Sequence, residues 1–168
     1  MSRELYELLL QRRSELAASV AERLRAPDAP HYSQLDPGRL QERATQLVHV
    51  LLESVADLPA TFVRYIQGTA DERIGEGYFL DEIQLALSAL EARAWQIVVQ
   101  ESRCEDHARH LAQISTIVGA AKDHLARVYL CHKRRAEARV ARLEQRLLEL
   151  SRGTDAAPEA DEELSAGH

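Results

Sequence analysis

The sequence predicts an all-α protein, on three observations. Ala, Leu, Glu and Arg, which all favour helix, dominate a chain that has only 7 Gly and 5 Pro in 168 residues. Apolar residues recur at spacings of three and four, whereas alternating runs of Val, Ile and Thr, which are typical of strands, are hard to find. A hydrophobic fraction of 45% over this length is enough for one domain with a buried core.

Helix breakers divide the first hundred residues into predicted elements. Pro27 and Pro30 end the first helix. Asp36 followed by Pro37 has the form of an N-cap and a first helical residue. The predicted helices cover residues 2–25, 36–57, 59–75 and 80–98, and residues 26–35 form a loop.

A helical pattern of roughly 50 residues follows, up to about Arg152. Ser102 and Glu105 at its start have the spacing of a capping box, which starts a new helix or marks a kink. Its second half thins to one apolar stripe with steps of 7, 4, 3, 4 and 3, made by Tyr129, Ala136, Val140, Leu143, Leu147 and Leu150. These steps are typical of a heptad seam. Because a lone helix with such a stripe is not stable, we expect a partner, most simply a second copy in a homodimer.

The chain is therefore expected to comprise a helical domain at residues 1–130, a coiled-coil linker helix at 131–152 and a disordered acidic tail at 153–168. From Asp155 onward the tail holds five acids and no base, so it carries −5 of the net charge of −6. This balance argues against a general nucleic-acid binder. Glutamates interleave with the basic side chains of the linker, which favours a solvated coiled-coil face over a surface for acidic lipid.

The cellular compartment is predicted from what the sequence lacks. Two cysteines, Cys104 and Cys131, are too few for a disulfide framework and indicate a reducing environment. We find no signal peptide and no apolar run of about 20 residues that could span a membrane. We expect a cytoplasmic protein without membrane insertion.

The segment Glu72–Glu82 contains a Gly-x-Gly at Gly75 and Gly77. A dinucleotide-binding loop needs a strand before it and a third glycine, but the preceding segment is helical and Leu80 stands where that glycine belongs. No Walker lysine follows. A turn between two helices is favoured, and Asp81 and Glu82 suit the first turn of the second helix.

Histidines give a candidate metal site. Cys104, His107 and His110 are spaced at i, i+3 and i+6, and His49 or His124 could complete a zinc or iron site. Neither Cys104 nor His107 belongs to a Glu-x-x-His motif, so surface histidines are favoured over a metal site.

Haem held by one of the core histidines is the alternative cofactor, although two Phe and one Trp are few for a haem pocket. Enzymatic activity has little support. Cys131 and His132 are neighbours and would point about 100° apart on a helix, and no serine-nucleophile motif is present. We therefore expect no cofactor and no catalytic residues.

Aromatic residues cluster in the middle third of the chain. Core and turn packing is the favoured interpretation. The alternative is the wall of a small ligand pocket between helices, for which the candidates are Phe62, Tyr65, Phe79 and Trp95.

One block, ADERIGEGYFLDEIQLALSALEARAWQIV, resembles the N-terminal sensor domain of RsbR-type stressosome proteins. The matching positions are Arg73, Gly77, Leu80, Glu82, Leu87 and Trp95. ASVAERLRA near the N-terminus is also similar to the family, and the resemblance covers roughly residues 3–135.

The resemblance implies a globin-like fold without haem, dimerisation through the first and last helices, and a last helix that continues into an output domain. Here a short acidic tail stands in place of that domain. The chain is then either a single-domain relative that acts by binding or one from which the output half has been left off. We expect a dimeric, non-enzymatic sensory domain of bacterial stress or signal transduction that acts on a downstream signalling protein. A globin-like haem- or metal-binding sensor is the alternative.

Overall fold

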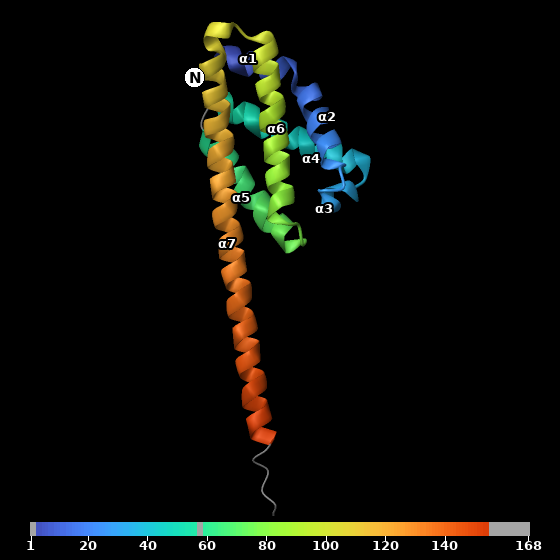
Figure 1. The fold of residues 1–168 in the computed structure, drawn as a ribbon, viewed down its shortest axis with the longest axis vertical. Helices are drawn as coiled ribbons and strands as arrows, with labels where there is room; N and C mark the ends of the chain where they lie inside the picture. Colours follow the sequence, from blue (N-terminus) through green and yellow to red (C-terminus); the bar gives the residue numbers. More distant parts are fainter. Residues whose placement is uncertain (1–2, 57–58, 155–168) are drawn as a thin grey trace, which may run out of the picture. The chain divides into compact units, whose positions relative to one another are not determined.

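The computed structural model describes residues 3–56 and 59–154, and these form helices and turns without a strand (Figure 1). The elements are α1 (Arg3–Gln11), α2 (Arg13–Leu24), α3 (Pro30–Ser33), α4 (Pro37–Ala56), α5 (Pro59–Gly75), α6 (Leu80–Glu101), the 3-10 turn η1 (Cys104–Asp106) and α7 (His107–Thr154). The all-α prediction is confirmed. The predicted acidic tail lies outside the described residues, apart from its first two positions, which end α7.

The chain divides after Leu130 into two units, and α7 runs through the division. In the first unit, α2 packs on α4 and α6, α1 contacts the same two helices, α5 packs on α4 and α3 packs on α6. The N-terminal part of α7 adds one buried stripe to this core, formed by Ile114, Ile117, Val118, Ala121 and Leu125. Their spacing of three and four residues puts them on one face of the helix.

The single helix predicted for residues 2–25 is wrong, because the chain breaks at Arg12. The φ and ψ angles of Arg12 are −101° and 10°, outside the helical range. The break lets α1 and α2 both pack on α4 and α6 while Leu5, Leu9 and Leu16 stay buried. Periodicity could not reveal it, since the apolar spacing continues through the break.

The loop predicted for residues 26–35 is also corrected in part, because α3 forms inside it. Pro30 is the first residue of α3, where its missing N–H is not needed. The predicted N-cap of α4 is confirmed: Oδ2 of Asp36 accepts hydrogen bonds from the backbone N–H of Gly38 at 2.9 Å and of Arg39 at 3.3 Å.

Ser102 does not cap the following helix. It closes α6 instead: its backbone is extended, and its hydroxyl donates to the carbonyl of Val98 at 2.8 Å. The η1 turn then leads into α7, a continuous helix of 48 residues. The expected break lies here, between α6 and α7, but the capping box does not form, because Ser102 is the C-cap of α6.

Gly77 ends α5 in the way the sequence predicts for a turn. Its φ is +93°, a backbone conformation that residues with a Cβ rarely adopt. Its N–H donates to the carbonyl of Ile74, and the N–H of Tyr78 donates to the carbonyl of Arg73. This is the hydrogen-bond pattern of a Schellman cap, so the glycines close a helix and do not cradle a phosphate.

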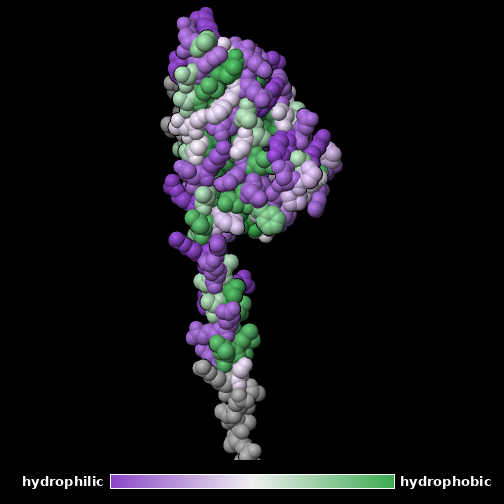
Figure 2. Space-filling view, viewed as in Figure 1, coloured by the Kyte–Doolittle hydropathy of each residue, from purple (hydrophilic) through white to green (hydrophobic). Residues whose placement is uncertain are grey.

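The C-terminal part of α7 has no buried side chain among residues 133–151. Figure 2 shows hydrophobic and hydrophilic residues alternating along it. In the described ranges, no helix combines the length and the apolarity needed to cross a membrane.

Replacing Leu90, which is fully buried on α6, with alanine should lower the free energy of unfolding by about 2–5 kcal/mol, because it leaves a cavity. Val99→Ala on the same helix, where the side chain is 54% exposed, should change it by less than about 0.5 kcal/mol. Urea unfolding followed by circular dichroism measures both. Equal midpoints for the two variants would contradict the assigned core.

Candidate ligand-binding site

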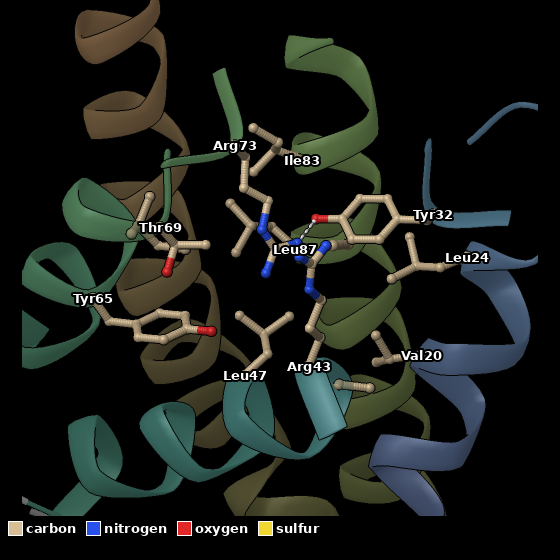
Figure 3. Close-up of a pocket in the computed structure, with 13 residues that line it drawn as sticks. Val20, Leu24, Tyr32, Arg43, Leu47, Tyr65, Thr69, Arg73, Ile83 and Leu87 are labelled. Atoms are coloured by element: carbon tan, nitrogen blue, oxygen red, sulfur yellow. Dashed lines mark hydrogen bonds between the residues drawn. The ribbon is translucent and has the colours of Figure 1, made fainter. Parts of the chain in front are cut away.

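A small cavity of about 20 Å³ lies inside the first unit (Figure 3). This is enough for about one water-sized atom. Much of its wall is aliphatic, from Val20, Leu24, Leu47, Ile66, Ile83 and Leu87. Its polar lining comes from Tyr32, Arg43, Tyr65, Thr69 and Arg73. The polar lining contains donors and hydroxyl groups but no carboxylate.

Three helices present these polar groups. Tyr65, Thr69 and Arg73 follow one another at intervals of four residues on α5, so they share one face of that helix. Tyr32 comes from α3 and Arg43 from α4. The charged ends of both arginines converge in the cavity (Figure 3).

Arg73 is the more buried arginine, with 7% of its surface exposed. Its Nη1 donates to the hydroxyl of Tyr32 at 2.5 Å. Its guanidinium carbon lies 5.2 Å from the ring centre of Tyr32 and 5.6 Å from that of Tyr78, within cation–π range. Its Nε is buried and has no hydrogen-bond partner among the described residues.

Arg43 differs because an acid pairs with it. Its Nη1 donates to the hydroxyl of Tyr78 at 2.6 Å, and its Nη2 lies 3.7 Å from a carboxylate oxygen of Glu76. A quarter of its side chain is exposed. Arg43 therefore stands at the rim of the cavity, whereas Arg73 lies within it.

Tyr32 stays neutral at physiological pH. Burial raises the pKa of its hydroxyl to about 12, although the nearby Arg73 opposes the shift. The hydroxyl accepts from Arg73 and keeps its own proton available to donate.

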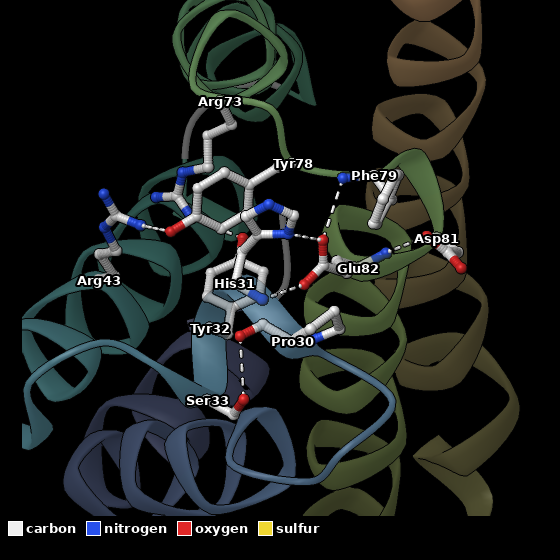
Figure 4. A network of polar contacts seen from close by, with 10 residues as sticks. All are labelled: Pro30, His31, Tyr32, Ser33, Arg43, Arg73, Tyr78, Phe79, Asp81 and Glu82. Atoms are coloured by element: carbon white, nitrogen blue, oxygen red, sulfur yellow. Dashed lines mark hydrogen bonds and ion pairs between the residues drawn. The ribbon is translucent and has the colours of Figure 1, made fainter.

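A buried carboxylate holds α3 in place beside this cavity (Figure 4). Glu82, which is 1% exposed, accepts from the backbone N–H of His31 at 2.7 Å and from that of Phe79 at 3.0 Å. Nδ1 of the His31 ring lies 2.7 Å from Oε2 of Glu82, the same oxygen that accepts from Phe79. Because His31 precedes Tyr32, this contact also fixes the tyrosine against Arg73.

These contacts set the charge state of Glu82. Burial by itself would raise the pKa of its carboxyl group, but the hydrogen bonds from Phe79 and His31 outweigh burial and hold the pKa below its usual value. Glu82 is therefore ionised at neutral pH.

The four aromatic residues predicted to line a pocket lie in different places. Tyr65 lines the cavity, and Phe62 is fully buried in the core. Phe79 is 58% exposed and Trp95 is 41% exposed. Tyr32, Arg43 and Arg73 were not predicted as site residues, because an arginine on a helix normally faces solvent and Tyr32 lies in a segment predicted as a loop. The interval of four between Tyr65, Thr69 and Arg73 was the signal that could have found Arg73, whereas no spacing along the chain points to Tyr32 or Arg43.

The histidines of the predicted metal site are also dispersed. His49 is exposed beside Glu53, at 3.3 Å. Nε2 of His107 lies 3.1 Å from the carbonyl of Ser102. His124 is half-buried, and its buried Nε2 has no hydrogen-bond partner in the part of the chain that the structure describes. Cys104 is exposed.

His110 belongs to a different group. Its ring lies with carboxylates of Glu4 and Asp106, and the ligand atoms of the three residues fall within 4.8 Å of one another. Arg109 bridges both acids, at 3.1 Å and 2.7 Å, so an arginine already offsets one of their two negative charges. Burial and then Arg109 lower the pKa of the buried His110, which favours the neutral ring.

A second hollow, of about 760 Å³, is lined by α1, α2 and α4, with Tyr6, Leu10, Val48 and His49 among its residues. Its lining includes both acidic and basic side chains, so it favours neither an anionic nor a cationic ligand.

The predicted seam residues are accessible. Val140, Leu143, Leu147 and Leu150 are 52–70% exposed, and Tyr129 is partly exposed. Leu148, which is 59% exposed, lies off the heptad stripe.

No family model, curated protein or solved structure matches the chain.

The lowered pKa of Glu82 predicts a pH-dependent contribution to stability. The stabilisation is fully present above about pH 5 and is lost as the pH falls below about 4, because protonation then releases the hydrogen bonds to the carboxylate. Glu82→Gln should lower the free energy of unfolding by about 1–3 kcal/mol at pH 7. Its difference from the wild type should shrink below pH 4. Urea titrations at several pH values measure this, with the exposed Glu72→Gln as the control. A difference that does not depend on pH would contradict the assignment.

Proposed function

We propose that this chain is a dimeric, non-enzymatic sensory or regulatory domain of bacterial stress or signal transduction. It would relay a signal through the C-terminal part of α7. The observation that carries the proposal is the exposed heptad stripe on that helix. The resemblance to RsbR-type sensor domains supports the same function, together with a globin-like arrangement of helices without haem and a cytoplasmic location.

The residues of the stripe favour a two-stranded coiled coil. In heptad notation Val140 and Leu147 occupy position a, and Leu143 and Leu150 occupy position d. A β-branched residue at a together with leucine at d is typical of parallel dimers, and Val140 meets this rule, whereas Leu147 at the other a position does not. Lys133 falls at an a position, where a single polar residue fixes the register at some cost in stability.

Charges beside the stripe favour the parallel orientation. Glu137 and Glu144 occupy e positions, and Arg139 and Arg146 occupy g positions. In a parallel pair, a g residue faces the e residue of the next heptad on the other helix, so Arg139 would face Glu144 of the second copy. In an antiparallel pair, g faces g and e faces e, which would oppose like charges.

A parallel pair suits a relay. It keeps the two N-terminal ends of the paired segments together, so a change in crossing or register at that end reaches the other end. Such a relay requires two states that a ligand or partner biases. The downstream partner would be a signalling protein or an output domain that reads the paired helices.

A haem- or metal-binding sensor is the second candidate, and Glu4, Asp106 and His110 are the residues whose ligand atoms lie together for a metal. Native mass spectrometry separates the two functions. The dimer alone at twice 18.9 kDa supports the first, and stoichiometric added metal or haem supports the second.

The seam predicts which leucines hold the dimer together. Leu143→Glu combined with Leu147→Glu should give a monomer in light scattering, because four glutamates would face one another in the apolar seam. Leu148→Glu is the matched control and should stay dimeric, since Leu148 is equally exposed but occupies position b. A dimer that survives the double substitution would contradict the proposed seam.

The orientation predicts a crosslinking pattern. With Cys104→Ser and Cys131→Ser as background, Ala136→Cys and Leu150→Cys should each form an intermolecular disulfide in high yield, because both residues occupy position d. An antiparallel pair could juxtapose equivalent residues at no more than one of these positions. Failure of both variants to crosslink would exclude the parallel seam.

A further inference from the structure

We propose that the cavity beside Arg73 binds a small monoanion, either a halide ion or the carboxylate group of a short acid. This site goes beyond the proposed dimer and uses other residues. It lies wholly within residues 20–87, so its test is separate from that of α7.

Arg73 carries a positive charge that no acid of the described residues balances. Arg73 is 93% buried, and no carboxylate of the described residues lies within the 4.0 Å of an ion pair. A guanidinium does not give up its proton in a protein, so burial cannot neutralise it. The rings of Tyr32 and Tyr78 offset part of the cost of burying it. An anion from solution would supply the missing counter-charge.

The neighbouring charges set the valence of that anion. Glu76 pairs with Arg43 at the rim. Glu82, which unlike Glu76 is buried, already accepts from His31 and from the backbone N–H of Phe79. One positive charge remains, that of Arg73, so a single negative charge balances the site.

The donors set the position of the anion. Nε of Arg73 has no partner and lies at the cavity, and the hydroxyl groups of Tyr65 and Thr69 point into the same space (Figure 3). The hydroxyl of Tyr32 also keeps a proton to donate. A small anion could therefore accept hydrogen bonds from several sides.

The walls set its size and hydration. A volume of about 20 Å³ holds about one atom of the size of a water molecule or a halide, or one oxygen of a carboxylate group. The aliphatic lining cannot replace the water that surrounds a doubly charged ion such as sulfate. Arg43, Tyr65 and Thr69 are each partly exposed, so the anion could enter along the rim that they form.

Chloride is the first probe, because the line width of its 35Cl NMR signal increases when the ion exchanges with a protein site. We expect the wild type to broaden the signal in millimolar sodium chloride and Arg73→Met to lose at least most of that excess. Arg64→Met is the matched control: Arg64 is an exposed arginine on the same helix, and the variant should broaden the signal as the wild type does. Equal broadening by the wild type and Arg73→Met would overturn the proposal, as would half-saturation only at several hundred millimolar chloride.

Competition separates the two classes of monoanion. Sodium acetate that removes the excess line width at equal ionic strength identifies a carboxylate site, and bromide alone doing so identifies a halide site. Sulfate at the same ionic strength should leave the broadening unchanged. Displacement by sulfate as effective as that by bromide would show general screening and would overturn the proposal.

Thermal unfolding distinguishes an anion site from a purely structural arginine. The Tm of the wild type should rise with chloride, because an ion that binds the folded state stabilises it. The Tm of Arg73→Met should not depend on chloride and should be no lower than that of the wild type without chloride, since the uncompensated charge is gone. A lower Tm for the variant at every concentration, with the same chloride dependence as the wild type, would show a structural role only.

A second pair of variants keeps the test decisive if Arg73→Met does not fold. Tyr65→Phe and Thr69→Val remove hydroxyl donors and leave the arginine in place. Combined, they should weaken chloride binding several-fold, and unchanged affinity would overturn the proposed position of the anion.

Discussion

The buried carboxylate of Glu82 is the contact on which the arrangement around the cavity depends. It joins the first turn of α6 to α3 across 51 residues of sequence through two hydrogen bonds with His31, and it also accepts from the backbone N–H of Phe79. A four-residue helix such as α3 has no stability of its own, so this tertiary contact keeps it in place. Tyr32 then lies against Arg73, and the rings of His31 and Tyr78 pack at 4.9 Å.

Arg73 shows that burial affects the energetics of a charged side chain more than ion pairing at the surface does. The exposed pair Arg3 and Glu7 lies in high dielectric and contributes little to stability. Arg73 lies where water cannot solvate it, and its side-chain hydrogen bond goes to a neutral tyrosine, Tyr32. On the outer face of α5, water would solvate the same side chain, and its charge would need no partner. A buried, uncompensated cation beside free donors is instead an arrangement suited to recognising an anion.

Helix α7 combines two kinds of sequence in one continuous element. From Ile114 to Leu125 its apolar residues meet a core, and from Tyr129 to Leu150 they form a stripe of heptad spacing that is open to solvent in the single chain. The period alone does not distinguish these uses, because both repeat every three to four residues. The flanking charges differ in two heptads, where Glu137 and Glu144 stand at e and Arg139 and Arg146 at g, an arrangement that a second helix could pair with.

The sequence by itself determined the helical class, the ends of α4 and α5, and the long last helix, because local signals decide these features. Asp36 caps α4, Gly77 takes a positive φ at the end of α5, and no proline interrupts α7. Only the tertiary structure decided the break at Arg12, the helix at Pro30–Ser33 and the role of Ser102, because these depend on contacts between distant segments. The cavity likewise required the fold: Tyr32, Arg43 and Arg73 lie on three separate helices, and no spacing along the chain brings them together.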